Sequence, residues 1–189
     1  TAEPDNAVLF TAHTLYRIGS EGMELKNEVT NNSGLETIAR VGQSFCLPAA
    51  FDTLSWYGKG PWETYADRKD AAFTGFYTSS VAEQHVPFAV PCECGGHEDT
   101  RFAALSDGTH TVQIVGSDDF HFSALPYSMA EYRKAAYEEE LPEHTTGTWL
   151  ILDAAHAGLG GDTGWTKNIH PEYRVCKGRY SYTFRFHFA

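Results

Sequence analysis

Hydrophobic and polar residues alternate most regularly near the carboxyl end of the chain. Over 179–188 the two kinds of side chain take turns, with Tyr180, Tyr182, Phe184, Phe186 and Phe188 on one face and Ser181, Thr183, Arg185 and His187 on the other. A period of two places successive side chains on opposite sides of an extended strand. The pattern therefore predicts a strand whose aromatic face lies in an apolar core.

Eight further segments have strand composition: 7–18, 23–30, 37–47, 73–81, 100–105, 110–115, 120–125 and 148–152. Glycine-, serine- and asparagine-rich turns such as 19–22, 31–34 and 106–109 separate them. Many short strands at this spacing are typical of antiparallel sheets packed face to face. We therefore expect an all-β protein, an antiparallel β-sandwich, over 1–189 as a single domain.

One segment is predicted to be helical. Ser128 and Glu131 have the spacing of a capping box, in which the serine hydroxyl and the glutamate carboxylate each bond a free backbone N–H group. The helix should run to about Glu140 and end before Pro142. The sandwich thus carries one short helix.

Composition and charge argue against several classes of binding partner. The chain has 189 residues, of which 42% are hydrophobic and 14% aromatic, enough for a sizeable core. Its formal net charge of −11 argues against nucleic acid and anionic membrane surfaces as partners. No run of eighteen apolar residues offers a transmembrane helix, and 1–6 has no signal-peptide pattern.

Recognisable catalytic and metal-binding motifs are absent. A nucleophile elbow, a P-loop, a dinucleotide fingerprint and H-E-x-x-H do not occur, and no motif singles out a carboxylate pair among the 25 acidic residues. The four cysteines are expected to be free thiols. Cys92, Cys94 and His97 do not have the C-x-x-C spacing usual in structural zinc sites.

Two segments contain more aromatic residues and glycines than an ordinary connecting loop needs. The first is WYGKGPWETYADRK at 56–69, in which aromatic residues, two glycines and a proline precede a polar cluster of Asp67 and Arg68. It predicts a turn packed by Trp56, Trp62 and Tyr65 and tied by Glu63 and Arg68. The second is GLGGDTGW at 158–165, followed by NIHPEY at 168–173. Four glycines in eight residues predict a loop whose backbone shape is specified closely.

These two segments carry a resemblance to a known family. Together with EQHVP at 83–87, Pro91 and FSALPY at 122–127, they resemble the successive signatures of the C-terminal, small-chain domain of glycoside hydrolase family 2 β-galactosidases, in order, from about position 40 to the end. The resemblance implies a galactose mutarotase-like supersandwich. It also implies that this chain is a fragment of a larger multidomain enzyme and lacks the domain's first strands.

The resemblance further implies a substrate-binding pair, Trp165 and Asp162. Trp165 would reach into an active site formed mainly by another domain and offer a flat platform to the aglycone, the glucose of lactose. An indole suits this role because a sugar ring presents an apolar C–H face. Asp162 would order the glycine turn by bonding its backbone, rather than touch the sugar.

Catalysis is assigned elsewhere by the same resemblance. Both catalytic glutamates, and the magnesium and sodium ions of the parent enzyme, would lie in a β/α barrel that this sequence does not contain, so no cofactor and no catalytic residue is expected here. The expected partners are a β-galactoside, the remaining domains of the enzyme and a further copy in a homo-oligomer. Two departures stand out: Cys94 replaces the family's asparagine, and Thr163 and Gly164 replace an aspartate and a serine.

Two other functions stay open at this stage. A stand-alone epimerase of mutarotase type would need a histidine and a glutamate that move a proton between ring oxygen and anomeric hydroxyl, with His85, His121, His170 and Glu172 as candidates. A carbohydrate-binding module would instead use exposed aromatic rings such as Trp62 and Trp165.

Overall fold

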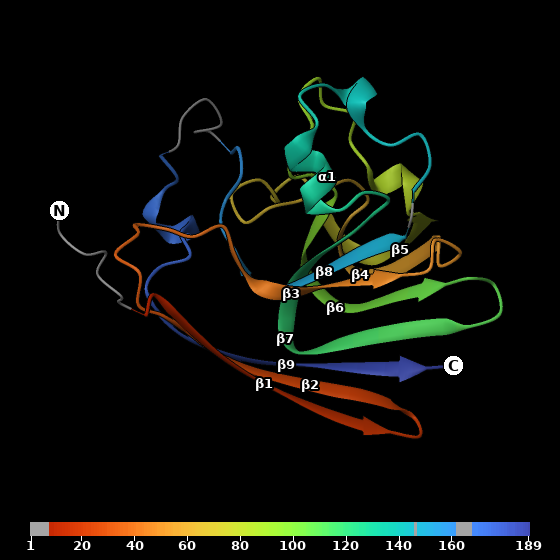
Figure 1. The fold of residues 1–189 in the computed structure, drawn as a ribbon, viewed down its shortest axis with the longest axis horizontal. Coiled ribbons are helices and arrows are strands. Elements are labelled where there is room, and N and C mark those ends of the chain that lie inside the picture. Colours follow the sequence, from red (N-terminus) through yellow and green to blue (C-terminus); the bar gives the residue numbers. More distant parts are fainter. Residues whose placement is uncertain (1–7, 146, 162–167) are drawn as a thin grey trace, which may run out of the picture.

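Nine antiparallel strands form the framework of the described part of the protein (Figure 1). The computed structural model describes residues 8–145, 147–161 and 168–189. The strands are β1 (Phe10–Gly19), β2 (Gly22–Asn31), β3 (Arg40–Leu47), β4 (Thr53–Gly60), β5 (Phe73–Ser80), β6 (Gly96–Ser106), β7 (Thr111–Leu125), β8 (Thr148–His156) and β9 (Gly178–Phe188).

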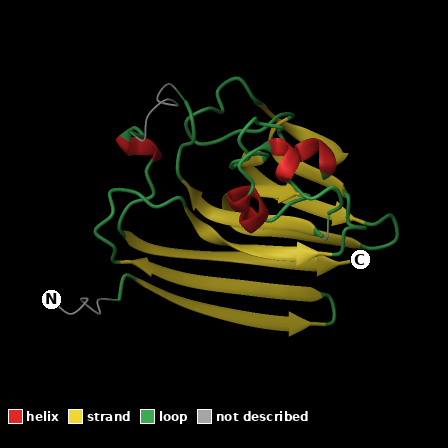
Figure 2. Ribbon diagram, turned by 45° about the horizontal axis from the view of Figure 1, so that its top comes forward, coloured by secondary structure: helices red, strands yellow, loops and turns green. Residues whose placement is uncertain are grey.

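Helical segments are few and short in the described part of the chain. They are the α-helix α1 (Met129–Lys134) and the 3₁₀ helices η1 (Ala82–Gln84), η2 (Glu138–Glu140) and η3 (Pro171–Tyr173). Figure 2 shows them with the long loops on one side of the curved sheet, away from the β1–β2 hairpin. No helix in the described ranges is long and apolar enough to cross a membrane.

The long strand β7 joins the two layers of the sandwich. Strand β6 pairs with both halves of β7, whereas β9 pairs only with its first half. The second half, from His121 to Leu125, also pairs with β8, which in turn pairs with β3. The main hydrogen-bonded path runs β1-β2-β9-β7-β6-β4-β5, so β8 and β3 branch from it. This branching confirms an all-β antiparallel sandwich with one short α-helix.

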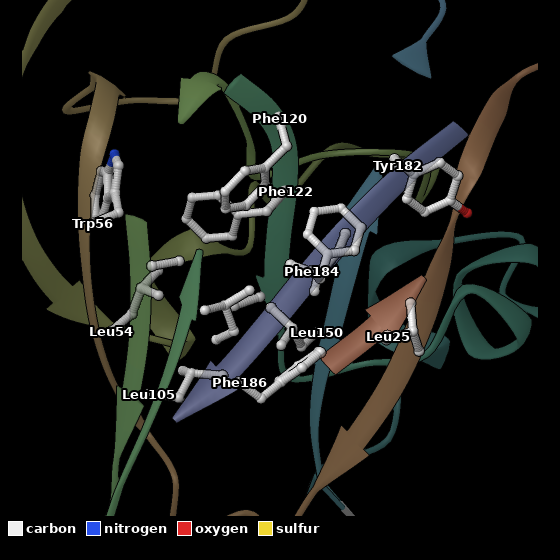
Figure 3. Packing of buried hydrophobic residues seen from close by; sticks show 14 of the residues in the cluster. Leu25, Leu54, Trp56, Leu105, Phe120, Phe122, Leu150, Tyr182, Phe184 and Phe186 are labelled. Carbon is white, nitrogen blue, oxygen red and sulfur yellow. The ribbon is translucent and has the colours of Figure 1, made fainter. Parts of the chain in front are cut away.

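The core lies between these layers (Figure 3). Leu25 of β2, Phe184 of β9, Phe122 of β7 and Leu150 of β8 are each at most 1% exposed. The alternation over 179–188 is confirmed, because the buried residues of β9 are the aromatic ones at every second position. At the end of the strand Phe188 is an exception, since it is 55% exposed.

Two predicted strands are a single one. The segments 110–115 and 120–125 belong to one strand of fifteen residues, although Gly116, Ser117 and two aspartates lie between them. The Ser117 hydroxyl accepts a bond from the Thr183 N–H of β9 at 3.2 Å. Gly116 is needed because a Cβ there would lie 2.5 Å from the carbonyl oxygen of Asp118.

Strand β4 was missed because its glycines suggested a turn. A Cβ at Gly58 would lie 2.6 Å from the Thr100 hydroxyl, and one at Gly60 would lie 2.8 Å from the ring of Tyr77. These glycines therefore serve close packing within a strand. Trp56 of the same strand belongs to the core and is buried as expected.

The predicted helix is too long. Its capping box is present, with both the hydroxyl of Ser128 and the carboxylate of Glu131 bonded, but α1 ends at Lys134 because Ala135 is extended. Three glutamates at 138–140 would lie at the negative end of a longer helix dipole. They occupy the first turn of η2 instead, and Glu140 accepts a bond from the Ala136 N–H at 2.8 Å.

Candidate functional site: the base of the glycine loop

The glycine-rich loop leaves strand β8 from a fixed base, residues 157–161. The Ala157 N–H donates to the carbonyl oxygen of Ala39, and the Gly158 N–H to that of Tyr173, each at 2.9 Å. The base is thereby tied to the start of β3 on one side and to η3 on the other.

The carboxylate of Asp67 binds the next part of the base. Its Oδ1 accepts the Leu159 N–H at 2.8 Å, and its Oδ2 accepts the N–H groups of Gly160 at 3.2 Å and Gly161 at 3.0 Å. Successive backbone N–H groups that converge on one anion form a nest, a concave site of positive potential. Asp67 fills the nest from within the chain.

The glycines are required by this arrangement. A Cβ at Gly158 would lie 2.7 Å from the carboxylate carbon of Asp67, and one at Gly161 would lie 2.4 Å from the Asp67 carbonyl oxygen. Gly160 has a φ of +109°, which side chains other than hydrogen rarely allow. Two glycines thus permit close approach and the third permits the turn.

Asp67 belongs to a turn that is anchored in the protein interior. Tyr65 is fully buried, and Arg68 lies over its ring, 4.9 Å from the centroid. Arg68 also donates to Glu63 Oε1 at 2.6 Å, while Glu63 Oε2 accepts the Gly95 N–H at 2.8 Å. The expected ties are confirmed, but Trp62 is 67% exposed and does not pack the turn.

Beneath this turn lies a buried polar cluster of Arg40, Glu93, His121, Asp153 and His156. The Arg40 guanidinium pairs with Glu93 and lies 3.5 Å from Asp153 Oδ2. Asp153 also bonds His121 at 3.1 Å. The ring of Tyr65 contacts both histidines of the cluster, with centroids 5.4 and 5.3 Å apart.

The histidines of the cluster are neutral at physiological pH, because burial lowers the pKa of His121 and of His156 to about 3. His156 donates from Nδ1 to the Ala157 carbonyl oxygen at 2.7 Å and accepts at Nε2 from Arg40 at 2.9 Å. Burial raises the pKa of Asp153 to about 6 despite the neighbouring guanidinium. Arg40 therefore supplies the positive charge of the cluster.

This charge bears on metal binding. One ligand atom from each of His121, Asp153 and His156 lies within 4.8 Å of the others. Arg40, however, approaches two of these three residues, at His156 Nε2 (2.9 Å) and at Asp153 Oδ2 (3.5 Å). A cation between them would meet the guanidinium charge. The three side chains therefore fit a role in the ionic cluster better than a role as metal ligands.

Two pockets flank the cluster. A pocket of about 230 Å³ opens beside the loop base and is lined by Arg40, Glu93 and His156 together with Ile38, Leu159 and Ile169. Another of about 220 Å³ brings His121 and Glu172 together with Glu98. Two of the four candidates for proton transfer thus share a pocket.

The sequence-predicted binding residues, Trp165 and Asp162, lie outside the described residues, as do Thr163 and Gly164. The structure gives the base from which they follow in the chain. Sequence reasoning noted Asp67 only as part of a polar cluster with Arg68. It missed Arg40 and Asp153, although a charged residue directly after Leu150-Ile151-Leu152 signals a buried ion pair.

Cys94 lies in a second, smaller cluster. Its thiol is buried, 3.7 Å from the Tyr132 hydroxyl, and Tyr132 in turn bonds His85 at 2.7 Å. Burial raises the pKa of Cys94 to about 11, so the thiol is not activated. Among the described residues, Cys92, Cys94 and His97 form no group that could hold a metal ion.

Comparison with known proteins identifies relatives over nearly the whole chain. Residues 1–186 match the family described as the β-galactosidase small chain. A β-galactosidase of Vibrio cholerae is 39% identical over 164 residues, and one of Priestia megaterium is 34% identical over 178 residues. These alignments cover 87% and 94% of this chain but only 15% and 17% of the relatives.

A solved structure of an Escherichia coli K12 protein, assigned as an aldose 1-epimerase, superimposes with a TM-score of 0.49 at 10% identity, covering 100% of this chain and 63% of that one. The family assignment rests on the sequence match, which extends over residues 1–186. The chain therefore belongs to the β-galactosidase small-chain family.

Proposed function

We propose that this chain is the C-terminal β-sandwich domain of a retaining glycoside hydrolase family 2 β-galactosidase, an enzyme that hydrolyses terminal non-reducing β-D-galactose residues in β-galactosides such as lactose. One observation carries the proposal: a family match over residues 1–186 in a chain that spans about one sixth of its β-galactosidase relatives. A segment of that size completes a larger enzyme.

In this proposal the domain binds and does not catalyse. A retaining glycosidase needs two carboxyl groups about 5 Å apart on either side of the scissile bond. These glutamates, with the magnesium and sodium ions, belong to a separate barrel domain. Trp165 contributes the aromatic platform for the aglycone, and Asp162 orders the turn before it. The other domains, and further copies of the enzyme, are the macromolecular partners.

The first measurement is the mass of the native gene product, read beside two activity assays. We expect a product several times longer than 189 residues that hydrolyses nitrophenyl β-galactoside. This chain alone should give no rate above buffer. A native product of 189 residues, or hydrolysis by the chain alone, would contradict the proposal.

The platform is tested in the full-length enzyme by Trp165→Ala. Loss of the indole removes stacking against the aglycone, so KM for lactose should rise about tenfold, which corresponds to about 1.4 kcal/mol. The matched control is Trp62→Ala, an exposed tryptophan on another loop. Equal KM values for Trp165→Ala and the parent enzyme would remove the platform from the proposal.

A further inference from the structure

We propose that Asp67 is the positioning residue for the sugar platform: its carboxylate fixes the backbone at 159–161 and thereby sets the point from which the chain continues to Trp165. The inference rests on the proposed function, because it assigns Asp67 a role at the same binding site. It starts from three bonds, since both carboxylate oxygens are used and three consecutive N–H groups point at them.

Both carboxylate oxygens of Asp67 accept hydrogen bonds from these amides. None of the ion pairs found among the described residues includes Asp67, and the adjacent Arg68 pairs with Glu63 instead. Hydrogen bonds from N–H groups to an ionised carboxylate are roughly twice as strong as those between neutral groups. The three hydrogen bonds therefore tie the loop base to this carboxylate.

The support of Asp67 is rigid. Two residues before it, Tyr65 is fully buried, and its ring contacts those of both His121 and His156. The Arg68 N–H donates to the Tyr65 carbonyl oxygen at 2.9 Å and closes the turn around Asp67. A binding group is held accurately only when the residues behind it are themselves locked by packing. The turn and the buried polar cluster provide that second layer.

Asp67 is connected to the platform through the chain, because the residues that it binds lie close to Trp165 in the sequence. Gly161, the last residue bound by Asp67, precedes Trp165 by four positions. A misplacement of about 1 Å in a group that positions substrate can lower a rate about a hundredfold. Loss of the Asp67 bonds should therefore reach the aglycone contact without touching the catalytic centre.

The test uses full-length enzyme with Asp67→Asn, Trp165→Ala and the double variant. Asparagine keeps the shape of the side chain but replaces one acceptor oxygen with an NH₂ group. Asp70→Asn is the matched control, since it makes the same change at an exposed aspartate three residues away. Each enzyme is assayed with lactose and with β-galactosyl fluoride, whose leaving group has no ring to stack.

We expect both single variants to raise KM for lactose about tenfold and to leave kcat/KM for the fluoride within about twofold. The double variant should be no worse than Trp165→Ala, because Asp67 acts through the platform. Asp70→Asn should match the parent enzyme with both substrates.

Two outcomes would overturn the inference but leave the platform in place. In the first, Asp67→Asn does not change KM for lactose. In the second, Asp67→Asn lowers kcat/KM equally for lactose and the fluoride, and the double variant is worse than Trp165→Ala alone. If Trp165→Ala has no effect, the platform itself fails. Should Asp67→Asn not fold, Gly161→Ala displaces the same segment, because its Cβ would lie 2.4 Å from the Asp67 carbonyl oxygen. Its control is Gly34→Ala, where a Cβ meets nothing within 4 Å.

Discussion

At the scale of single residues, burial favours the uncharged form of a titratable side chain, and Glu98 is an example. Burial raises the pKa of Glu98 to about 7, even though Lys69 lies 3.8 Å away and opposes the shift. Its side chain is only 13% exposed. The folded protein therefore holds this proton at pH values where the unfolded chain, in which the carboxyl has its ordinary pKa of 4.5, has released it.

The sign of the pH dependence follows from that difference. The stability contributed by Glu98 is fully present below pH 4.5 and is lost as the pH rises through about 7. In Glu98→Gln the loss disappears. Relative to the parent chain, this variant should gain up to about 3 kcal/mol in free energy of unfolding between pH 4.5 and pH 8.

Urea unfolding at a series of pH values measures this gain. The control variant Glu139→Gln removes an exposed carboxylate. Its free energy of unfolding should depend on pH in the same way as that of the parent chain. If the free energies of unfolding of Glu98→Gln and the parent chain differed by the same amount at every pH, Glu98 would ionise equally in the folded and unfolded states, and the prediction would be wrong.

At the scale of elements, the short helix α1 depends on its cap. Six residues are too few for a helix to be stable by itself in water. The hydroxyl of Ser128 bonds the Glu131 N–H at 3.2 Å, and the Glu131 carboxylate bonds the Ser128 N–H at 2.6 Å. On the inner face of the helix, Tyr132 packs with Cys94 and Leu125. Capping and this contact together keep the helix formed.

Ser128→Ala should therefore lower the free energy of unfolding by about 1 kcal/mol, because it removes one of the two reciprocal cap bonds. Ser20→Ala, in the exposed β1–β2 turn, should change it by less than about 0.5 kcal/mol. Denaturant midpoints of the two variants give the comparison. Equal midpoints would mean that packing alone holds α1.

The elements also show where sequence patterns succeed. Strand β9 was predicted because its two faces meet different surroundings, the core and the solvent. The 106–109 turn was predicted from its turn-forming residues, and the structure shows that the Asp107 carboxylate accepts N–H bonds from Thr109 and His110 at 2.8 and 2.6 Å. Strand β4 was not predicted because its glycines are needed for close packing against Thr100 and Tyr77. Both residues lie far from these glycines in the sequence, so the local pattern does not reveal the contact.

At the scale of the whole molecule, β1 is one of the open edges of the described sheet. It pairs only with β2, and Leu15, Tyr16 and Ile18 are 49%, 52% and 80% exposed. Unpaired edge groups beside exposed apolar side chains favour pairing with another chain. In the proposed enzyme this edge is a surface available to the remaining domains.

The isolated chain is therefore expected to self-associate. Sedimentation velocity should show a weight-average mass that rises with concentration, and Tyr16→Lys with Ile18→Lys should lower it because charge on an edge strand opposes pairing. Thr109→Lys adds charge at an exposed turn and should leave the mass unchanged. Monomeric sedimentation of the parent chain at every concentration would be inconsistent with an exposed pairing edge.

The sequence by itself determined the fold class, the aromatic face of β9, the capping box and, through its motifs, the family. These features are local or repeat along one strand, so neighbouring residues are sufficient to specify them. Only the tertiary structure decided that β7 is one strand joining two layers, that Arg40 lies between two carboxylates, and that Asp67 binds the glycine loop. Asp67 and Gly161 are separated by 94 residues, and a bond between them forms only when the folded sheet brings both segments together.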